Sequence, residues 1–188
     1  MTPMPVLGAL RVHTKAIHES MHHAPPFARI ANGSMDRSGY GQVLRLLHSY
    51  HCAMAGACAR AAAALAAPDL AAAHAVRIAA LEDDMQALGC APLSTETRTP
   101  HNDAFSVGCL YTVQGSTLGG KVIYRQLDPL LPGDAGRRFF QGSPEDVSLW
   151  RSFCVRLEAY GAVTPLAEIE DGAAYAFDQF GRRFIEKA

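Results

Sequence analysis

Helical spacing of apolar residues is the feature that most constrains the fold of this chain. Apolar side chains recur three or four positions apart along most of its 188 residues. No segment shows the strict alternation of apolar and polar residues that is typical of a half-buried strand. We therefore expect an all-α fold, a bundle of about six to eight helices, in which residues 1–188 form a single domain without internal repeats or a linker.

The boundaries of the expected helices follow from prolines, glycines and capping residues. Proline cannot continue the hydrogen-bond ladder, so "APPF" should end the first helix, whereas Pro68 suits the first position of another. Helices are expected at about 6–23, 36–67, 68–88 and 103–127, and two more near Ser143 and Thr164. The inward stripe of the second helix should comprise Tyr40, Val43, Leu44, Leu47, Tyr50 and Met54.

Composition excludes several classes of protein. With 17 basic and 18 acidic residues and a net charge of −1, the chain gives no electrostatic reason to expect nucleic acid. Five cysteines without a CxxC pair favour reduced, buried thiols. No apolar run approaches the roughly 20 residues that span a bilayer, and "MTPMPVLGALRVHTK" lacks the pattern of a secretion signal. We expect a soluble, cytoplasmic protein that does not enter a membrane.

One expected helix carries an unusual concentration of glycine. In "LYTVQGSTLGGKVIYRQL", residues 110–127, Gly115 and Gly119 lie one turn apart and Gly120 is adjacent. Each glycine costs a helix about 0.5–1 kcal/mol relative to alanine. We call residues 115–120 the glycine segment. From the residues alone, three explanations stay open: close packing of another helix, a kink, or a flat ligand lying against bare backbone.

Histidines are also concentrated in one place. Four of the eight lie in the first expected helix, namely His13, His18, His22 and His23. His18 is at the edge of the apolar stripe, between Ile17 and Met21, where a histidine is more often a satisfied core residue than a ligand. A buried imidazole there would be neutral, which is the form that binds a metal, and His22 one turn later could orient it.

Taken together, the first helix and the glycine segment resemble the heme oxygenase family. "LRVHTKAIHESM" is similar to the family's first helix and "QGSTLGGKV" to its distal helix, with a weaker similarity at "AYAFDQF". The resemblance implies heme b as both substrate and cofactor, with O2, opened to biliverdin, CO and iron. The chain lacks the GxGxxG pattern of nicotinamide or flavin sites, so electrons would come from an external ferredoxin or reductase.

The resemblance also assigns roles to individual residues. His18 falls on the iron ligand, and Gly115, Gly119 and Gly120 on the distal glycines. The residues expected to contact heme elsewhere are Arg11, Thr14, Tyr111, Arg156 and Phe177, of which Arg11, Tyr111 and Arg156 would meet the propionates. Ser116 stands where many members have an aspartate that holds the proton-supplying water, and His51 aligns near that water network. The wording "GSTLGG" is most similar to members associated with bacteriophytochromes, which makes a bacteriophytochrome a candidate partner.

Three other functions stay open from the sequence. A heme carrier or sensor without turnover is suggested by Ser116 in place of the acid. A non-heme metal oxidase could use Glu19 and His22 with His48 or His51, although di-iron bundles have two Glu-x-x-His pairs and only one occurs here. A structural protein would need the glycines only for close helix packing.

Overall fold

A computed structural model describes residues 5–22, 24–95 and 102–184, and within these ranges every regular element is helical. The expectation of an all-helical fold is confirmed. The elements are α1 (Pro5–His22), α2 (Pro25–Ala31), α3 (Arg37–Ala64), α4 (Pro68–Ala87), α5 (Asp103–Gly115), the 3₁₀ turn η1 (Ser116–Gly119), α6 (Gly120–Gln126), α7 (Arg138–Gln141), α8 (Asp146–Gly161) and α9 (Leu166–Phe184).

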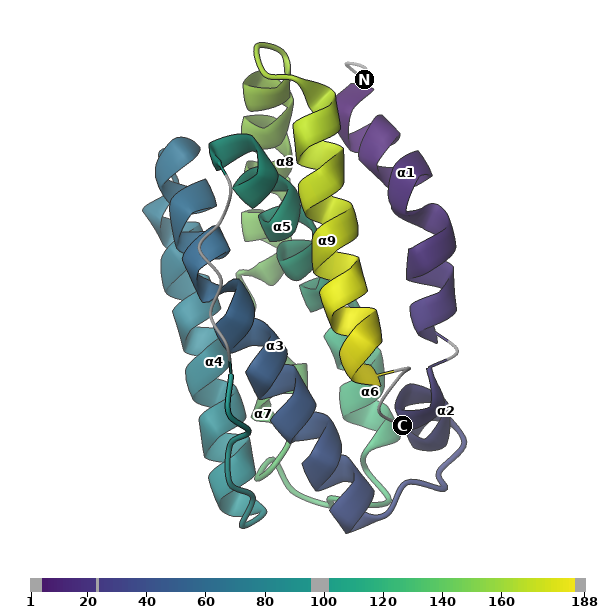
Figure 1. Cartoon of the computed structure of the whole chain (residues 1–188). Helices are drawn as coiled ribbons and strands as arrows, with labels where there is room; N and C mark the ends of the chain where they lie inside the picture. Colours follow the sequence, from purple (N-terminus) through teal and green to yellow (C-terminus); the bar gives the residue numbers. More distant parts are fainter. Residues whose placement is uncertain (1–4, 23, 96–101, 185–188) are drawn as a thin grey trace.

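Helices α5 and α9 cross at the centre of the bundle (Figure 1). Two glycines allow their backbones to touch. A Cβ atom at Gly108 would lie 1.9 Å from the carbonyl oxygen of Ile169, and one at Gly172 would lie 1.9 Å from that of Phe105. No side chain fits at either position, so these glycines fix the closest helix pair of the fold.

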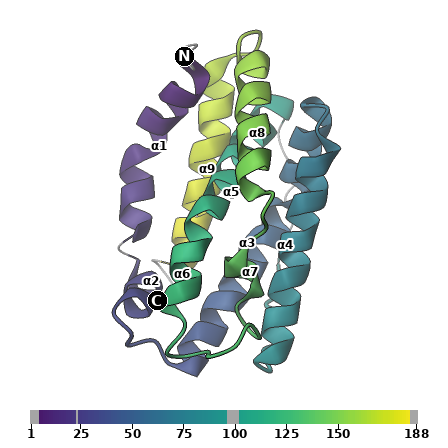
Figure 2. The ribbon, with the colours of Figure 1, turned by 180° about the vertical axis from the view of Figure 1, so that it is seen from behind.

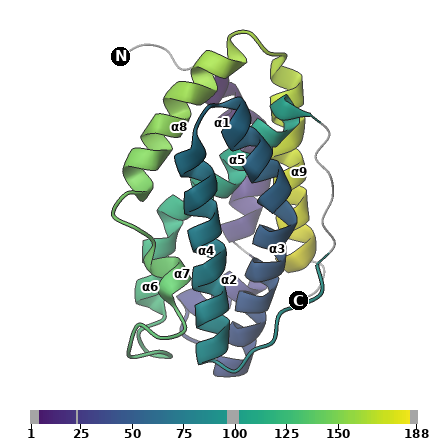
Figure 3. The same cartoon turned by 90° about the vertical axis from the view of Figure 1, so that its left-hand side faces the viewer.

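Helices α3 and α4 pack side by side on the face opposite α1 (Figure 3). The inward stripe expected for α3 is confirmed, since all six of its residues are buried. Asp36 caps this helix by accepting a hydrogen bond from the backbone N–H of Gly39, at 2.6 Å.

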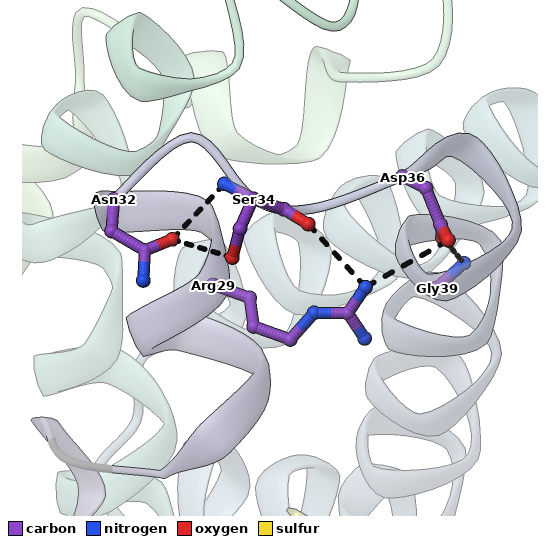
Figure 4. A network of polar contacts seen from close by, with 5 residues as sticks. All are labelled: Arg29, Asn32, Ser34, Asp36 and Gly39. Carbon is purple, nitrogen blue, oxygen red and sulfur yellow. Dashed lines mark hydrogen bonds and ion pairs between the residues drawn. The ribbon is translucent and has the colours of Figure 1, made fainter.

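The prolines of "APPF" do not simply end a helix, as the sequence predicted, because Pro25 opens the short helix α2. Proline has no N–H to lose at a first helical position, so it can both end one helix and begin the next. A polar network then joins α2 to α3 (Figure 4). Arg29 donates to the carbonyl oxygen of Ser34 and lies 3.8 Å from Asp36, while Asn32 accepts from the backbone and hydroxyl of Ser34.

Helix α1 packs against α8 and α9 along the edge of the bundle (Figure 2). Its first turn is held by Glu158, whose carboxylate accepts from the backbone N–H groups of Val6 and Leu7. All five cysteines are free thiols, and three of them are buried as expected, whereas Cys52 and Cys90 are half-buried. No helix within the described ranges is both long and apolar enough to cross a bilayer.

Candidate functional site

Two separate apolar clusters make up the core, one at each end of the bundle. Along four stretches of the chain, the fully buried apolar residues of one cluster give way to those of the other. Along α1 and the following turn, fully buried apolar residues stop at Leu10 and resume at Ala24. The corresponding interruptions run from 48 to 49 in α3, from 114 to 126 in α5–α6 and from 177 to 183 in α9. We call the residues in these interruptions, taken together, the middle layer.

Most of the candidate site residues lie in the middle layer or at its edge. His18, Ser116, Gly119 and Phe177 all lie in its interruptions, and His51 lies beside the one in α3. Tyr111 and Thr14 lie at the margin of the first apolar cluster. The fold therefore brings residues from the beginning, middle and end of the chain between the two apolar clusters, which Phe180 of α9 bridges.

A contact between α1 and α5 sets the relative positions of the two candidate faces. Thr14 of α1 lies beside the Tyr111 hydroxyl of α5, and both helices run in the same direction, toward the end that holds α2 and α6 (Figures 1 and 2). His18 lies one turn beyond Thr14, and Gly115 lies one turn beyond Tyr111. The imidazole and the glycine segment thus each lie one turn past this point, on helices that both pack against α9.

The glycine segment interrupts the expected helix at 103–127. Helix α5 ends at Gly115, η1 follows, and α6 begins at Gly120. The φ angles of Gly115, Gly119 and Gly120 are −62°, −83° and −57°, values that any residue adopts. Glycine is therefore not required here for backbone conformation, and its use must follow from the absence of a side chain.

The three glycines differ in what surrounds them. A Cβ at Gly115 would make ordinary contact with the Trp150 ring at 3.6 Å, and one at Gly120 would press on the carbonyl oxygen of Phe140 at 3.0 Å. Nothing lies within 4 Å of a Cβ at Gly119, which is exposed. Gly120 has a packing role, whereas Gly119 presents bare backbone to open space.

His18 is exposed, contrary to the expectation of an imidazole buried in the apolar stripe. The burial of α1 ends with Thr14, and Ile17 is only half-buried. The His18 ring lies edge-to-face with Phe177 of α9, with centroids 6.0 Å apart. The side chain of His22, expected to orient His18, lies outside the described part of the structure.

Tyr111 and Arg11 lie close together beside the Thr14 hydroxyl. Burial raises the pKa of Tyr111, while the neighbouring hydroxyl of Thr14 and the charge of Arg11 act in the opposite direction. Tyr111 therefore keeps its proton and can donate it, and Arg11 provides an exposed positive charge beside it. A phenol and a guanidinium at one edge suit a ligand carboxylate.

Ser116 is exposed, and its hydroxyl donates to the carbonyl oxygen of Val113 at 2.7 Å. Its proton is thus used within the helix, and the oxygen lone pairs are left as acceptors. His51 lies in different surroundings, buried against α4 and α7. The structure therefore does not join the two polar residues that the sequence placed in one network.

A buried polar cluster around His51 escaped the sequence analysis. The Nδ1 atom of His51 lies 3.1 Å from Nε2 of His74. Burial lowers the pKa of His51 well below its usual value and that of His74 to about 4, so both imidazoles are neutral near pH 7. His74 could have been identified from the sequence, because it is a histidine at an inward position of an alanine-rich helix.

Arg77 supplies the charge of this cluster. Its guanidinium lies over the Phe139 ring, 4.3 Å from the centroid, and burial lowers its pKa to about 10 while Asp146 acts to raise it. Among the described residues, none accepts a hydrogen bond from its buried Nε. A buried donor of this kind is the exception in proteins and marks a place for solvent or ligand.

Arg156 lies away from the middle layer. Its guanidinium donates to the carbonyl oxygens of Leu65 and Ala66, at 3.0 and 2.9 Å, where α3 ends. Its neighbours on α8, Phe153 and Leu157, belong to the apolar cluster at the other end of the bundle. The structure thus gives Arg156 a helix-capping role and does not bring it to the other candidate residues.

The residues of the middle layer fit a heme. An exposed imidazole beside an aromatic edge can bind the iron, and the space beside the Gly119 backbone admits a flat group where a side chain would obstruct it. Among the described side chains, which exclude His22, no group of three or more His, Cys, Asp or Glu is placed to hold a metal ion. The non-heme metal oxidase thus gains no support from the residues described.

The sequence pattern of the heme oxygenase family matches residues 4–186. The chain therefore belongs to the heme oxygenase family. It is similar to a heme oxygenase of Xanthomonas campestris pv. campestris (strain 8004), with 38% identity over 84 residues. These residues are 44% of this chain and 50% of that relative, so the match spans about half of the curated relative's length.

The fold is also similar to that of a solved structure, the NO- and CO-bound heme oxygenase from Neisseria meningitidis. The TM-score is 0.77, and the alignment covers 96% of this chain and 90% of that one, at 24% identity. At this level of identity, the similarity establishes the fold.

Proposed function

We propose that this chain is a heme oxygenase, which binds heme in the middle layer, between His18 and the glycine segment. The observation that supports the proposal is an exposed imidazole one turn past Thr14, and bare backbone at Gly119 in the segment that follows Tyr111, the neighbour of Thr14. When bound, heme supplies both the iron that activates O2 and the porphyrin that is opened to biliverdin, CO and iron.

His18 is the proposed iron ligand, and Phe177 limits the orientations of its ring by edge-to-face contact. Arg11 and Tyr111 are the proposed partners of the propionates, because one is cationic and the other keeps a donatable proton. Thr14 lies beside the Tyr111 hydroxyl, with its own proton donated to the carbonyl oxygen of Leu10 at 2.7 Å. Arg156 has no part in this proposal, since its guanidinium caps α3.

On the distal side, the glycine segment leaves room for O2 because no side chain projects from Gly119. Ser116 accepts hydrogen bonds, since its own proton is committed to Val113. The neutral pair of His51 and His74 can accept a proton at one ring nitrogen and release one at another, and the unpaired Nε of Arg77 can hold water beside it. We propose these as two separate contributions to the proton supply, because exposed Ser116 and the buried histidine pair lie in different surroundings.

The electrons come from an external protein, a ferredoxin or a reductase, in this proposal. The motif "GSTLGG" supports membership of the group associated with bacteriophytochromes, in which the product biliverdin becomes a chromophore. A bacteriophytochrome is accordingly the proposed acceptor of the product.

A heme carrier without turnover is the second candidate, and one observation favours it. Ser116 is uncharged and has its proton committed, so it holds fewer waters than an aspartate would. One experiment separates the two functions. The protein is titrated with hemin and then reduced with ascorbate in air, in the presence of catalase to remove free peroxide.

An oxygenase loses its Soret band while a red-absorbing bilin grows. A carrier keeps its Soret band under the same conditions. If hemin produces no Soret shift at all, both candidate functions are wrong.

A further inference from the structure

A buried carboxylate on α4 holds the short helix that lies between the glycine segment and His51. The carboxylate of Asp84 is fully buried, and its two oxygens accept from the backbone N–H groups of Arg138 and Phe139, at 2.8 and 2.9 Å. These are the first two residues of α7. Four residues do not form a stable helix without outside support.

Helix α7 touches both parts of the proposed distal side. The Phe139 ring packs edge-on against His51, with centroids 5.2 Å apart. The carbonyl oxygen of Phe140, the next residue, lies against Gly120, where it leaves no room for a Cβ atom. A displacement of α7 would therefore move the support of the glycine segment and one wall around His51 together.

Helix α7 is also held by the burial of Phe139 and Phe140, but Asp84 is the side chain that accepts from its first two backbone N–H groups. Arg138 forms an exposed ion pair with Asp83, at 3.4 Å, and such pairs contribute little to stability. Burial disfavours the charged form of Asp84 and raises its pKa, whereas its two backbone hydrogen bonds act to lower it. An apolar residue would avoid burying a charge, but it would leave the half-buried N–H of Arg138 and the buried N–H of Phe139 without this acceptor.

We infer that Asp84 is a positioning residue, which fixes the glycine segment and the wall around His51 by anchoring α7 from α4. This inference rests on the proposed function for its catalytic meaning. The positioning itself is a property of the protein without heme and can be measured there.

The test compares Asp84→Asn with Asp83→Asn, a matched change one residue away on the same helix. The asparagine side chain can accept from only one of the two N–H groups, because its amide nitrogen is itself a donor. Amide hydrogen exchange is followed by mass spectrometry in the protein without hemin. We expect exchange about tenfold faster in residues 116–120 as well as in 138–141 of Asp84→Asn, and unchanged rates in Asp83→Asn.

A second readout uses the hemin complex, with the pH midpoint of its ferric acid–alkaline transition. We expect this midpoint to shift in Asp84→Asn and not in Asp83→Asn, because it depends on the surroundings of the distal side. If Asp84→Asn does not fold, Asp84→Ser, which retains one acceptor, is measured in its place. Faster exchange in 138–141 with unchanged exchange in 116–120 would overturn the inference, as would equal effects in the Asp83 variant.

The two proposals fail separately. If wild-type protein binds no hemin while the exchange result holds, the activity is wrong and the positioning stands. If wild-type protein opens heme while exchange in 116–120 is unaffected, the positioning is wrong and the activity stands.

Discussion

The imidazole of His18 and the ring of Phe177 meet edge-to-face, with centroids 6.0 Å apart and planes at 89°. The two residues come from the first and the last described helices, so the contact exists only in the folded chain. It gives an exposed imidazole a defined neighbour on one side. An iron ligand with a restricted ring orientation loses less freedom when it binds.

Replacing Phe177 by leucine should therefore weaken hemin binding without unfolding the protein. An edge-to-face pair contributes about 0.5–1.5 kcal/mol, so affinity should fall about 2- to 10-fold. The measurement is a Soret titration with hemin, together with circular dichroism. Asp171→Ala, at an exposed position of the same helix, is the control. Equal affinities of the wild-type and Phe177 proteins would exclude this role of the contact.

Gly119→Leu should weaken hemin binding and spare stability, whereas Gly120→Leu should lower stability. Gly119 has open space around it and an ordinary helical φ, so Gly119→Leu should change the free energy of unfolding by less than about 0.5 kcal/mol. Its side chain would occupy the space proposed for heme, so hemin affinity should fall at least about tenfold. Gly120→Leu should lose about 1–3 kcal/mol of stability, because its Cβ meets the Phe140 carbonyl oxygen.

Urea unfolding and hemin titration of the two variants provide the comparison. Normal hemin affinity in Gly119→Leu would contradict the proposed position of heme. A stable Gly120→Leu would contradict the packing role assigned to that glycine.

The buried histidine pair should make stability depend on pH. Burial lowers the pKa of His74 from 6.5 to about 4 in the folded chain. As pH falls through 6.5, the unfolded chain takes up a proton that the folded chain does not, so stability is lost between pH 6.5 and about 4. The loss due to His74 alone is on the order of 3 kcal/mol.

Urea unfolding of the wild-type protein and of His74→Asn across this range measures the effect. We expect a flatter pH dependence in the variant, because asparagine can bond to His51 but does not titrate. Parallel curves for the two proteins would show that His74 is not protected from protonation in the folded chain.

Arg156→Ala should affect stability and leave hemin binding unchanged. The variant loses two hydrogen bonds to the carbonyl groups of Leu65 and Ala66, which should cost about 1–2 kcal/mol. Arg151→Ala, at an exposed position of the same helix, should cost less than about 0.5 kcal/mol. Thermal unfolding and hemin titration check both. A large loss of hemin affinity in Arg156→Ala would show that this residue contacts the propionates after all.

Local signals in the sequence predicted much of the fold. The start of α3 follows from the Asp36 cap and that of α4 from Pro68, whereas the helix expected at 103–127 is interrupted by η1. Helix α8 begins at Asp146, a little after Ser143, although the Ser143 hydroxyl does accept from the N–H of Glu145 as a cap would. Each of these features depends on residues within a few positions of one another.

Contacts between distant segments could not be predicted in this way. The close approach of α5 and α9 at Gly108 and Gly172 joins residues more than sixty positions apart, and no periodic pattern marks it. The same is true of the His51–His74 contact and of the bond from Arg156 to α3. The exposure of His18 was missed because helical spacing gives the face of a residue and does not show how far along a helix packing extends.

The most direct test of the central claim, that His18 binds the iron of a heme in the middle layer, is the ferric spectrum of His18→Ala titrated with hemin. We expect the variant to lose the histidine-ligated Soret and visible bands and its ability to form bilin with ascorbate in air. Added imidazole should restore the ligand bands, because it can occupy the space left by the side chain. A variant spectrum identical to that of the wild-type hemin complex, before any imidazole is added, would contradict the account.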